Sequence, residues 1–182
     1  DFTTKESCGK CTMCRMGNLQ LLSILEDIST GKAEMEDLKL LQQLAEDIKL
    51  GSLCGLGRSA PNPVLTTIRY FGDEYRAHIL EKRCPALVCK DLIVYYILPD
   101  KCDRACEHCV LVCPTEAIKG GKGEIKVIDQ EKCSKCGTCR EVCPPEYRAV
   151  IKVSPISKLP SAETGNDHNR HSREGGSPDL SL

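Results

Sequence analysis

The sequence contains no tryptophan and only two phenylalanines among its 182 residues. Large aromatic side chains supply much of the apolar surface that ordinary domains bury, so little of this core can be aromatic. The longest apolar run, residues 92–98, is far too short to span a bilayer. No apolar segment near the first residue resembles a signal peptide.

An excess of charge of one sign is also lacking, because 25 basic residues face 26 acidic residues, for a net charge of -1. This balance gives no electrostatic reason to expect nucleic acid or a membrane surface as a partner. Cysteine, in contrast, is abundant, with fourteen residues. These cysteines are crowded into short runs, as metal ligands are, which predicts a reducing, cytoplasmic location and a fold supported by metal.

Two consecutive cysteine runs, each ending in Cys-Pro, organise residues 102–144. The second run has the spacing C-x2-C-x2-C-x3-C-P, which is typical of bacterial ferredoxins with two [4Fe-4S] clusters. In such proteins three thiolates of a run bind one cluster and the fourth reaches the other cluster. The predicted ligand sets are Cys133, Cys136, Cys139 and Cys113 for one cluster, and Cys102, Cys106, Cys109 and Cys143 for the other.

The first run departs from this spacing. Three residues, at positions 103–105, separate Cys102 from Cys106, where the pattern has two. The loop must therefore bulge, or one ligand is lost. His108 offers a substitute ligand, although an exposed loop histidine is the simpler interpretation.

A third group of cysteines lies near the start of the chain. Cys8, Cys11 and Cys14 have the spacing C-x2-C-x2-C without a following proline. A cubane needs a fourth ligand, and the next cysteine, Cys54, is flanked by glycines that allow the backbone to bring its sulfur in. These four residues are predicted to hold a third [4Fe-4S] cluster. A zinc site of four cysteines is the alternative, because the same residues suit tetrahedral geometry.

Apolar residues at helical spacing predict three helices, around residues 21–28, 38–48 and 64–79. Glycines at positions 31 and 51 end the first two, and Asn62-Pro63 opens the third. We expect a small helical bundle with the leucines in its core.

His78, Cys84 and Cys89 form a further candidate group. Their side chains are of the types that bind zinc, and a structural tetrahedral site needs a fourth ligand, which is not obvious here. The hypothesis is a zinc site completed by residues from an upstream region. The alternative is a pair of buried thiols and a surface histidine.

The sequence thus predicts an α+β chain. A helical-bundle [4Fe-4S] domain covers residues 1–82, and a connector with the candidate zinc ligands covers residues 83–100. A ferredoxin-like domain with two [4Fe-4S] clusters follows over residues 101–155, with a short hairpin between its cysteine runs and a strand at residues 149–153. Residues 156–182, which are rich in small and polar residues, are predicted to be a disordered tail.

Two motifs carry a resemblance to a known family. The sequence ESCGKC at residues 6–11, with the distant CGLG at residues 54–57, resembles the C-terminal iron–sulfur part of the flavin- and NADH-binding subunit of bacterial complex I. The sequence CPALVCK at residues 84–90, followed by a two-cluster module, is more similar to the related subunit of NAD(P)-linked iron-only hydrogenases. The resemblance covers about residues 5–155.

The resemblance implies an electron relay with three [4Fe-4S] clusters. In that family the flavin takes a hydride from NAD(P)H and passes single electrons to the cluster that Cys8, Cys11, Cys14 and Cys54 would hold. FMN and NAD(P) would bind upstream, and the partners would be other subunits of an oxidoreductase or hydrogenase. The glycine-rich nucleotide and flavin motifs that precede the triplet in the family are absent, so we expect a fragment or shortened subunit that does not oxidise NADH alone.

Two other functions compete with this interpretation. A free-standing ferredoxin-type carrier would account for residues 102–144, but it does not need a helical bundle with its own cluster. A structural metal-binding interaction module, as in some nucleic-acid enzymes, would bind metal without redox change. The tandem ferredoxin spacing and the lack of a basic stripe argue against this second alternative.

Overall fold

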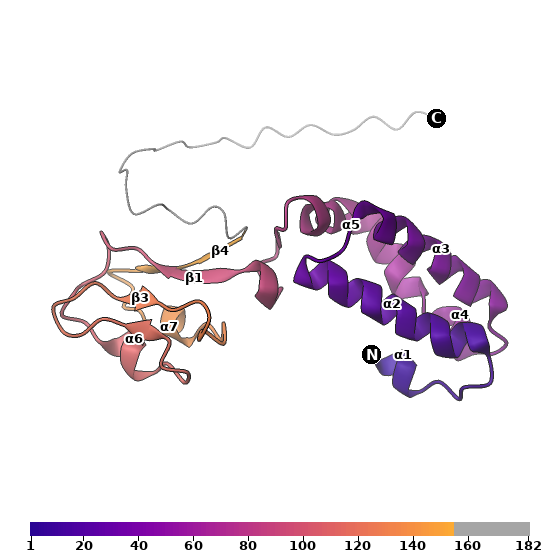
Figure 1. Cartoon of the computed structure of the whole chain (residues 1–182), viewed down its shortest axis with the longest axis horizontal. Coiled ribbons are helices and arrows are strands. Elements are labelled where there is room, and N and C mark those ends of the chain that lie inside the picture. Colours follow the sequence, from indigo (N-terminus) through magenta and orange to yellow (C-terminus); the bar gives the residue numbers. More distant parts are fainter. Residues whose placement is uncertain (155–182) are drawn as a thin grey trace, which may run out of the picture.

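The computed structural model describes residues 1–154, which form two lobes joined by a short segment (Figure 1). The first lobe is helical, and the second combines short helices with two-stranded antiparallel sheets. The predicted α+β class is therefore confirmed. The tail predicted over residues 156–182 lies outside the described residues. Among the helices described, none has the length and apolar character needed to cross a membrane.

The helical lobe is built mainly from three long helices, close to the predicted ranges. The elements of this lobe are α1 (Phe2–Lys5), α2 (Thr12–Thr30), α3 (Met35–Gly51), α4 (Gly55–Ser59) and α5 (Asn62–Leu80). Gly31 caps the C-terminal end of α2, and its φ of 78° is left-handed and suits glycine. Helix α3 begins with a capping box, in which the Asp37 carboxylate accepts the Glu34 backbone N–H at 2.8 Å.

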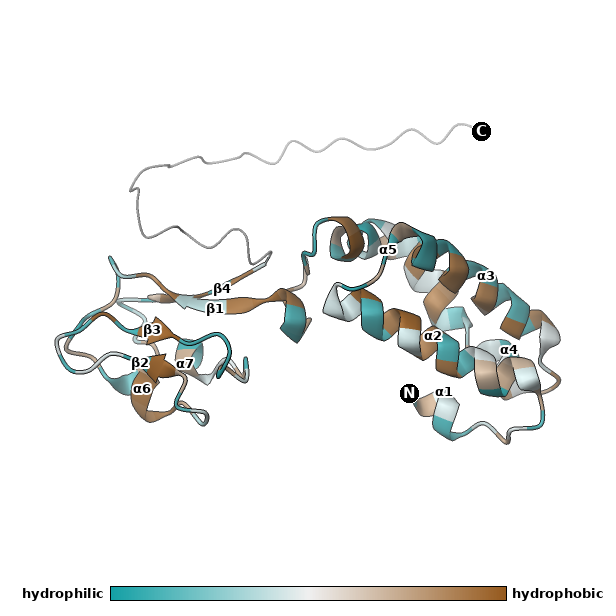
Figure 2. Cartoon of the chain, in the orientation of Figure 1, coloured by the Kyte–Doolittle hydropathy of each residue, from teal (hydrophilic) through white to brown (hydrophobic). Residues whose placement is uncertain are grey.

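Helices α2 and α3 bury their apolar faces against each other. Leu41, Ala45 and Ile48 of α3 are fully buried, and they belong to one core with residues of α2 and α5. A Cβ atom at Gly17 of α2 would lie 2.5 Å from Ile48 Cγ1, so the glycine allows the two helices to approach closely. The mixed colouring of both helices in Figure 2 reflects this division into an apolar and a polar face.

The small lobe contains short elements only. They are η1 (Lys90–Leu92), β1 (Val94–Ile97), α6 (His108–Leu111), β2 (Ile118–Lys119), β3 (Val127–Ile128), α7 (Thr138–Glu141) and β4 (Val150–Val153). Strands β2 and β3 form the hairpin expected between the two cysteine runs. Strand β1 pairs antiparallel with β4 over four residues, so the segment assigned to a connector contributes a strand to the sheet of this lobe.

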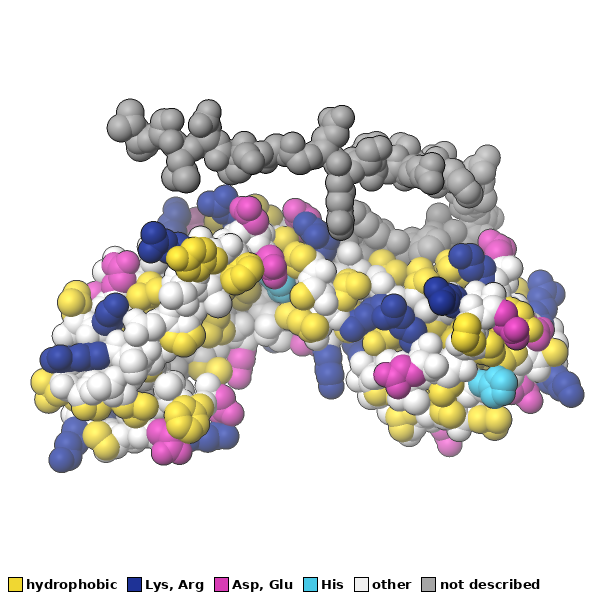
Figure 3. Space-filling model, turned by 180° about the vertical axis from the view of Figure 1, so that it is seen from behind, with side chains coloured by type: hydrophobic (Ala, Val, Ile, Leu, Met, Phe, Trp, Pro, Cys, Tyr) yellow, Lys and Arg dark blue, Asp and Glu magenta, His cyan; other side chains and the backbone are white. Residues whose placement is uncertain are grey.

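The segment between the lobes packs on the helical lobe. A Cβ atom at Gly31 would lie 2.7 Å from Leu92 Cδ2, which places η1 against the end of α2. The Lys135 Nζ atom donates to the Lys90 carbonyl at 2.6 Å, which ties a loop of the small lobe to the same segment. From behind, the lobes are separated below this junction, and lysine and arginine side chains are exposed on the small lobe (Figure 3).

Candidate metal centres

Two cavities in the small lobe are each lined by four cysteines. The first-run cavity contains Cys102, Cys106, Cys109 and Cys143. The second-run cavity contains Cys113, Cys133, Cys136 and Cys139. Each cavity therefore receives three cysteines from one run and the last cysteine of the other run. This is the crossed grouping that a two-cluster ferredoxin would need.

Short helices and one strand position these cysteines. Cys109 lies in α6 and Cys139 lies in α7, and both side chains are buried. Gly137 precedes α7 with a φ of 90°, and a Cβ atom there would lie 2.7 Å from the Tyr95 hydroxyl. Strand β1 contributes Ile97 to the first-run cavity and Tyr95 to the second-run cavity. One strand thus forms part of the wall of both cavities.

The thiols differ in how readily they ionise. Burial, reinforced by neighbouring cysteines, raises the pKa of Cys139 to about 11. The same two causes raise the pKa of Cys109. The pKa of Cys136 is lowered, because the Thr138 hydroxyl donates to its sulfur at 3.4 Å. Crowded thiols that oppose one another's ionisation need cations to become thiolates together, so this donor set fits an iron–sulfur cluster.

The extra residue in the first run produces a bulged loop. The Asp103 carboxylate accepts the Ala105 backbone N–H at 2.9 Å, and the Asp103 carbonyl accepts the Cys106 N–H at 3.1 Å. Cys106 nevertheless lines the first-run cavity. His108 lines the same cavity, and its Nδ1 atom lies 3.3 Å from the Cys106 sulfur. The structure therefore has the bulge and keeps all four cysteines at the cavity.

In the helical lobe, α4 holds Cys54 near the first turn of α2. Cys11 caps α2 and Cys14 lies in its first turn, where it is buried. A Cβ atom at Gly57 of α4 would lie 3.3 Å from Cys14 Cβ, so the two helices touch at this point. Backbone N–H groups of Gly57 and Leu56 lower the pKa of Cys54. Cys54 and Cys8 are both exposed, and Cys8 lies in the loop that precedes α2.

Polar donors surround Cys14. The Asn18 amide donates to the Cys14 sulfur at 3.5 Å, and the Ser7 hydroxyl lies at the same distance from it. The Ser52 hydroxyl is buried and has no hydrogen-bond partner within residues 1–154. Ser52 lies beside Gly57, against which Cys14 also packs. A sulfur-rich, negatively charged group fits this set of donors, since it would accept their hydrogen bonds.

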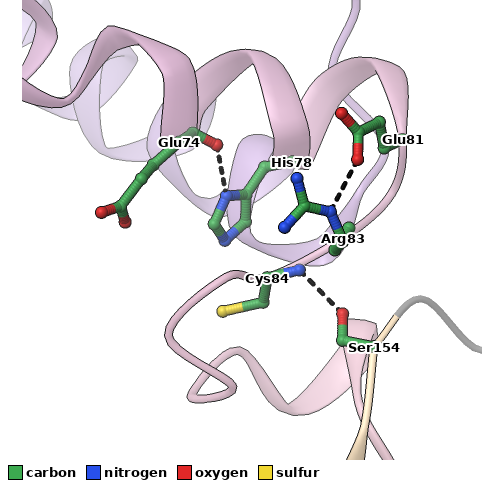
Figure 4. Close-up of polar contacts among 6 residues, drawn as sticks. All are labelled: Glu74, His78, Glu81, Arg83, Cys84 and Ser154. Carbon is green, nitrogen blue, oxygen red and sulfur yellow. Dashed lines mark hydrogen bonds and ion pairs between the residues drawn. The ribbon is translucent and has the colours of Figure 1, made fainter. Parts of the chain in front are cut away.

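His78, Cys84 and Cys89 converge at the end of α5. Their ligand atoms all lie within 4.8 Å of one another, although the three residues come from a helix and the loop after it. His78 Nδ1 bonds to the Glu74 carbonyl at 2.7 Å (Figure 4). A carbonyl only accepts, so Nδ1 carries the proton and Nε2 presents its lone pair. That Nε2 atom lies 3.3 Å from the Cys89 sulfur, and a metal-binding histidine usually donates its other ring N–H to a carbonyl or carboxylate in this way.

The two thiols of this group are electrostatically distinct. Burial acts to raise the pKa of Cys84, but backbone N–H groups of Cys89 and Val88 outweigh it and lower the pKa to about 7. The pKa of Cys89 is raised to about 11 by burial and by the adjacent Cys84. Cys84 is also fixed through its backbone N–H, which donates to the Ser154 hydroxyl at 2.8 Å (Figure 4).

Two residues at or near the cysteine cavities were not identified from the sequence. Tyr95 lies in an apolar segment that gives no sign of contact with Gly137. Lys126 is buried, although lysine is ordinarily exposed. The alternation along the hairpin is the available signal, because Lys126 and Ile128 are buried and Val127 between them is exposed.

The cysteine arrangement and the sequence both define an iron–sulfur protein. Residues 1–78 match the family model of the NADH-ubiquinone oxidoreductase-F iron-sulfur binding region. Residues 94–144 match the model of the 4Fe-4S dicluster domain. The resemblance inferred from the motifs is therefore confirmed, and the chain carries two iron–sulfur domains in succession.

Three curated proteins are similar to part of this chain. The chain is 50% identical over 122 residues to the NADP-reducing hydrogenase subunit HndC of Solidesulfovibrio fructosivorans, which covers 67% of this chain and 25% of the relative. It is 44% identical over 85 residues to the F subunit of NADH-quinone oxidoreductase from Streptomyces coelicolor, covering 47% and 19% of the two chains. It is 36% identical over 91 residues to the alpha subunit of the NAD-reducing hydrogenase HoxS from Cupriavidus necator, covering 50% and 15%. The chain thus spans a quarter or less of these relatives.

Proposed function

We propose that this chain is an electron relay with three [4Fe-4S] clusters. One cluster would be bound by Cys8, Cys11, Cys14 and Cys54, and the other two would occupy the first-run and second-run cavities. The relay would pass single electrons between a flavin and NAD(P)H site, located upstream of the matched region, and a partner redox protein such as a hydrogenase. The partner would be another subunit of the same complex.

The observation that carries this proposal is the sorting of eight cysteines into two cavities of four. A purely structural metal site needs only one tetrahedral set of ligands from neighbouring positions. In the small lobe, by contrast, the last cysteine of each run lies in the cavity formed by the other run, so the two sites are connected to each other. Electron transfer needs redox centres close together, so the linked cavities favour a relay over a structural metal module.

A bound [4Fe-4S] cluster accepts and returns one electron at a potential that its surroundings set. In this proposal no side chain makes or breaks a substrate bond. The cysteines hold the iron, and donors such as Thr138 and Asn18, which reach ligand sulfurs at 3.4 and 3.5 Å, stabilise negative charge on sulfur. Strand β1 contributes a residue to the wall of each cavity and is itself held by its pairing with β4.

Anaerobic reconstitution with iron and sulfide tests the proposal. We expect about 12 irons per chain, which is three clusters of four, and electron spin resonance signals from all of them after reduction. About eight irons would show that one site does not form a cubane. Metal that cannot be reduced and reoxidised would contradict the relay and favour a structural module. Zinc in place of iron at Cys8, Cys11 and Cys14 would mean that no redox centre receives electrons from the flavin.

We also propose that His78, Cys84 and Cys89 bind zinc. The convergence of their ligand atoms, the lone pair that His78 Nε2 directs at Cys89 and the backbone N–H that donates to the Cys84 sulfur support three of the four ligands of a tetrahedral site. A fourth ligand would come from residues of an upstream region. The zinc would then fix the segment between the two lobes, since Cys84 and Cys89 both belong to it.

Zinc analysis of His78→Ala tests this second proposal. We expect a preparation that includes the upstream region to contain about one zinc per chain, and the variant to lose it while it keeps its iron. Leu80→Ala is the matched control, because Leu80 is 66% exposed on the same helix and should leave the zinc content unchanged. Equal zinc in His78→Ala and Leu80→Ala would refute the site.

A further inference from the structure

A lysine is buried in the small lobe next to the bulged loop of the first run. The Lys126 side chain is 1% exposed and directly precedes β3. Burial of a charged group is costly unless it is paired and hydrogen-bonded. A specific set of partners must therefore offset this cost, and the structure contains one.

Three backbone carbonyls surround the Lys126 Nζ atom. They belong to Arg104 at 3.0 Å, Gly121 at 2.6 Å and Glu124 at 3.0 Å. An ammonium group has three N–H donors and no acceptor. Each donor therefore has one acceptor, which is the arrangement that the charged form of lysine requires. Within residues 1–154 no carboxylate is paired with this charge.

One of these carbonyls belongs to the loop with the extra residue. Arg104 is the middle residue between Cys102 and Cys106, and its carbonyl also accepts the Gly123 N–H at 2.8 Å. The hairpin turn before β3 therefore uses both lone pairs of this oxygen. The bulge is anchored to the hairpin through Lys126, so its shape depends on a residue that lies outside both cysteine runs.

The charge of Lys126 also lies close to the first-run cavity. The Lys126 Nζ atom is 3.0 Å from the carbonyl of Arg104, and Arg104 lies between the candidate ligands Cys102 and Cys106. Cys102 lines the first-run cavity, and Lys126 lines neither cavity. The lysine therefore contacts the loop that carries Cys102 and Cys106 without lining the cavity itself.

We propose that Lys126 positions the bulged loop for the cluster of the first-run cavity and raises the midpoint potential of that cluster. The inference rests on the proposed relay, because it requires a cluster bound by Cys102, Cys106, Cys109 and Cys143. A cluster with four thiolates is negatively charged, and a nearby positive charge in a dry environment stabilises the additional electron. Loss of the charge therefore makes reduction of this cluster harder.

Redox titration of Lys126→Gln in the full reconstituted chain, followed by electron spin resonance, tests the proposal. Glutamine keeps two of the donors and removes the charge. At a fixed potential we expect the ratio of reduced to oxidised first-run cluster to fall about tenfold, which is about 59 mV for a one-electron couple. Lys122→Gln is the matched control, because Lys122 is exposed in the same turn and undergoes the same change of charge.

The second-run cluster is an internal control for folding. Ile128, two residues after Lys126, lines the second-run cavity, so an unchanged second-run signal shows that the hairpin is intact. Loss of iron from the first-run site alone, with the second-run cluster retained, would support the positioning role.

Three results would overturn the proposal. These are an unchanged first-run potential in Lys126→Gln, an equal shift in both clusters, and a shift no larger than that of Lys122→Gln. Failure of the relay itself would look different, because the unaltered protein would then lack a reducible first-run cluster before any substitution was made.

Discussion

Replacing Cys113 by alanine should remove the cluster of the second-run cavity, although Cys113 belongs to the first run. We expect about four irons to be lost and one set of electron spin resonance signals to disappear, because a cubane lacking a thiolate ligand is poorly held. The expectation follows from the cavity that Cys113 lines together with Cys133, Cys136 and Cys139. Iron analysis of the anaerobically reconstituted variant provides the measurement.

Double variants of the cysteines identify which cluster is lost. Cys113→Ala combined with Cys133→Ala should lose no more iron than either change alone, since both residues would serve one cluster. Cys113→Ala combined with Cys109→Ala should lose about eight irons, since these residues line different cavities. The reverse pattern would mean that each run binds its own cluster and that the runs do not exchange a ligand.

Replacing Leu41 by alanine should lower the free energy of unfolding of the helical lobe by about 2–5 kcal/mol. Leu41 is fully buried in the core between α2 and α3, so the truncated side chain leaves a cavity that the helices can only partly fill. Denaturant titration followed by the helical circular dichroism signal measures the change, with every variant carrying the same iron content.

The adjacent residue on the same helix provides the control. Leu40 is 48% exposed, and its replacement by alanine should change the free energy of unfolding by about 0.5 kcal/mol or less. If Leu40→Ala and Leu41→Ala were equally destabilising, the packing face assigned to α3 would be wrong.

Local patterns were sufficient to predict the parts of the fold that depend on near neighbours. The face of α3 that contains Leu41 and Ala45 follows from helical spacing, and that face is buried. The cysteine runs were recognisable because their ligands lie within a few residues of one another. The hairpin of β2 and β3 was likewise expected from two short apolar segments around a glycine-rich turn.

Contacts between distant segments were not predictable from these patterns. The pairing of β1 with β4 joins ends of the small lobe that are far apart in the sequence, and an apolar run of this length fits a helix or a strand equally well. The contact of Gly57 with Cys14 depends on how α4 docks on α2. Burial of Lys126 depends on a carbonyl supplied by the bulged loop, which spacing alone does not place.

Because Val94 pairs with Val153, the two ends of the segment 94–153 lie at neighbouring points. A unit whose two ends are adjacent can be moved into a surface loop of another protein with little change in the path of the flanking chain. The small lobe therefore has the geometry of a transferable cassette. If residues 94–153 were inserted into another protein, both cysteine cavities would be transferred with them. The recipient protein would then carry the two candidate cluster sites of this lobe.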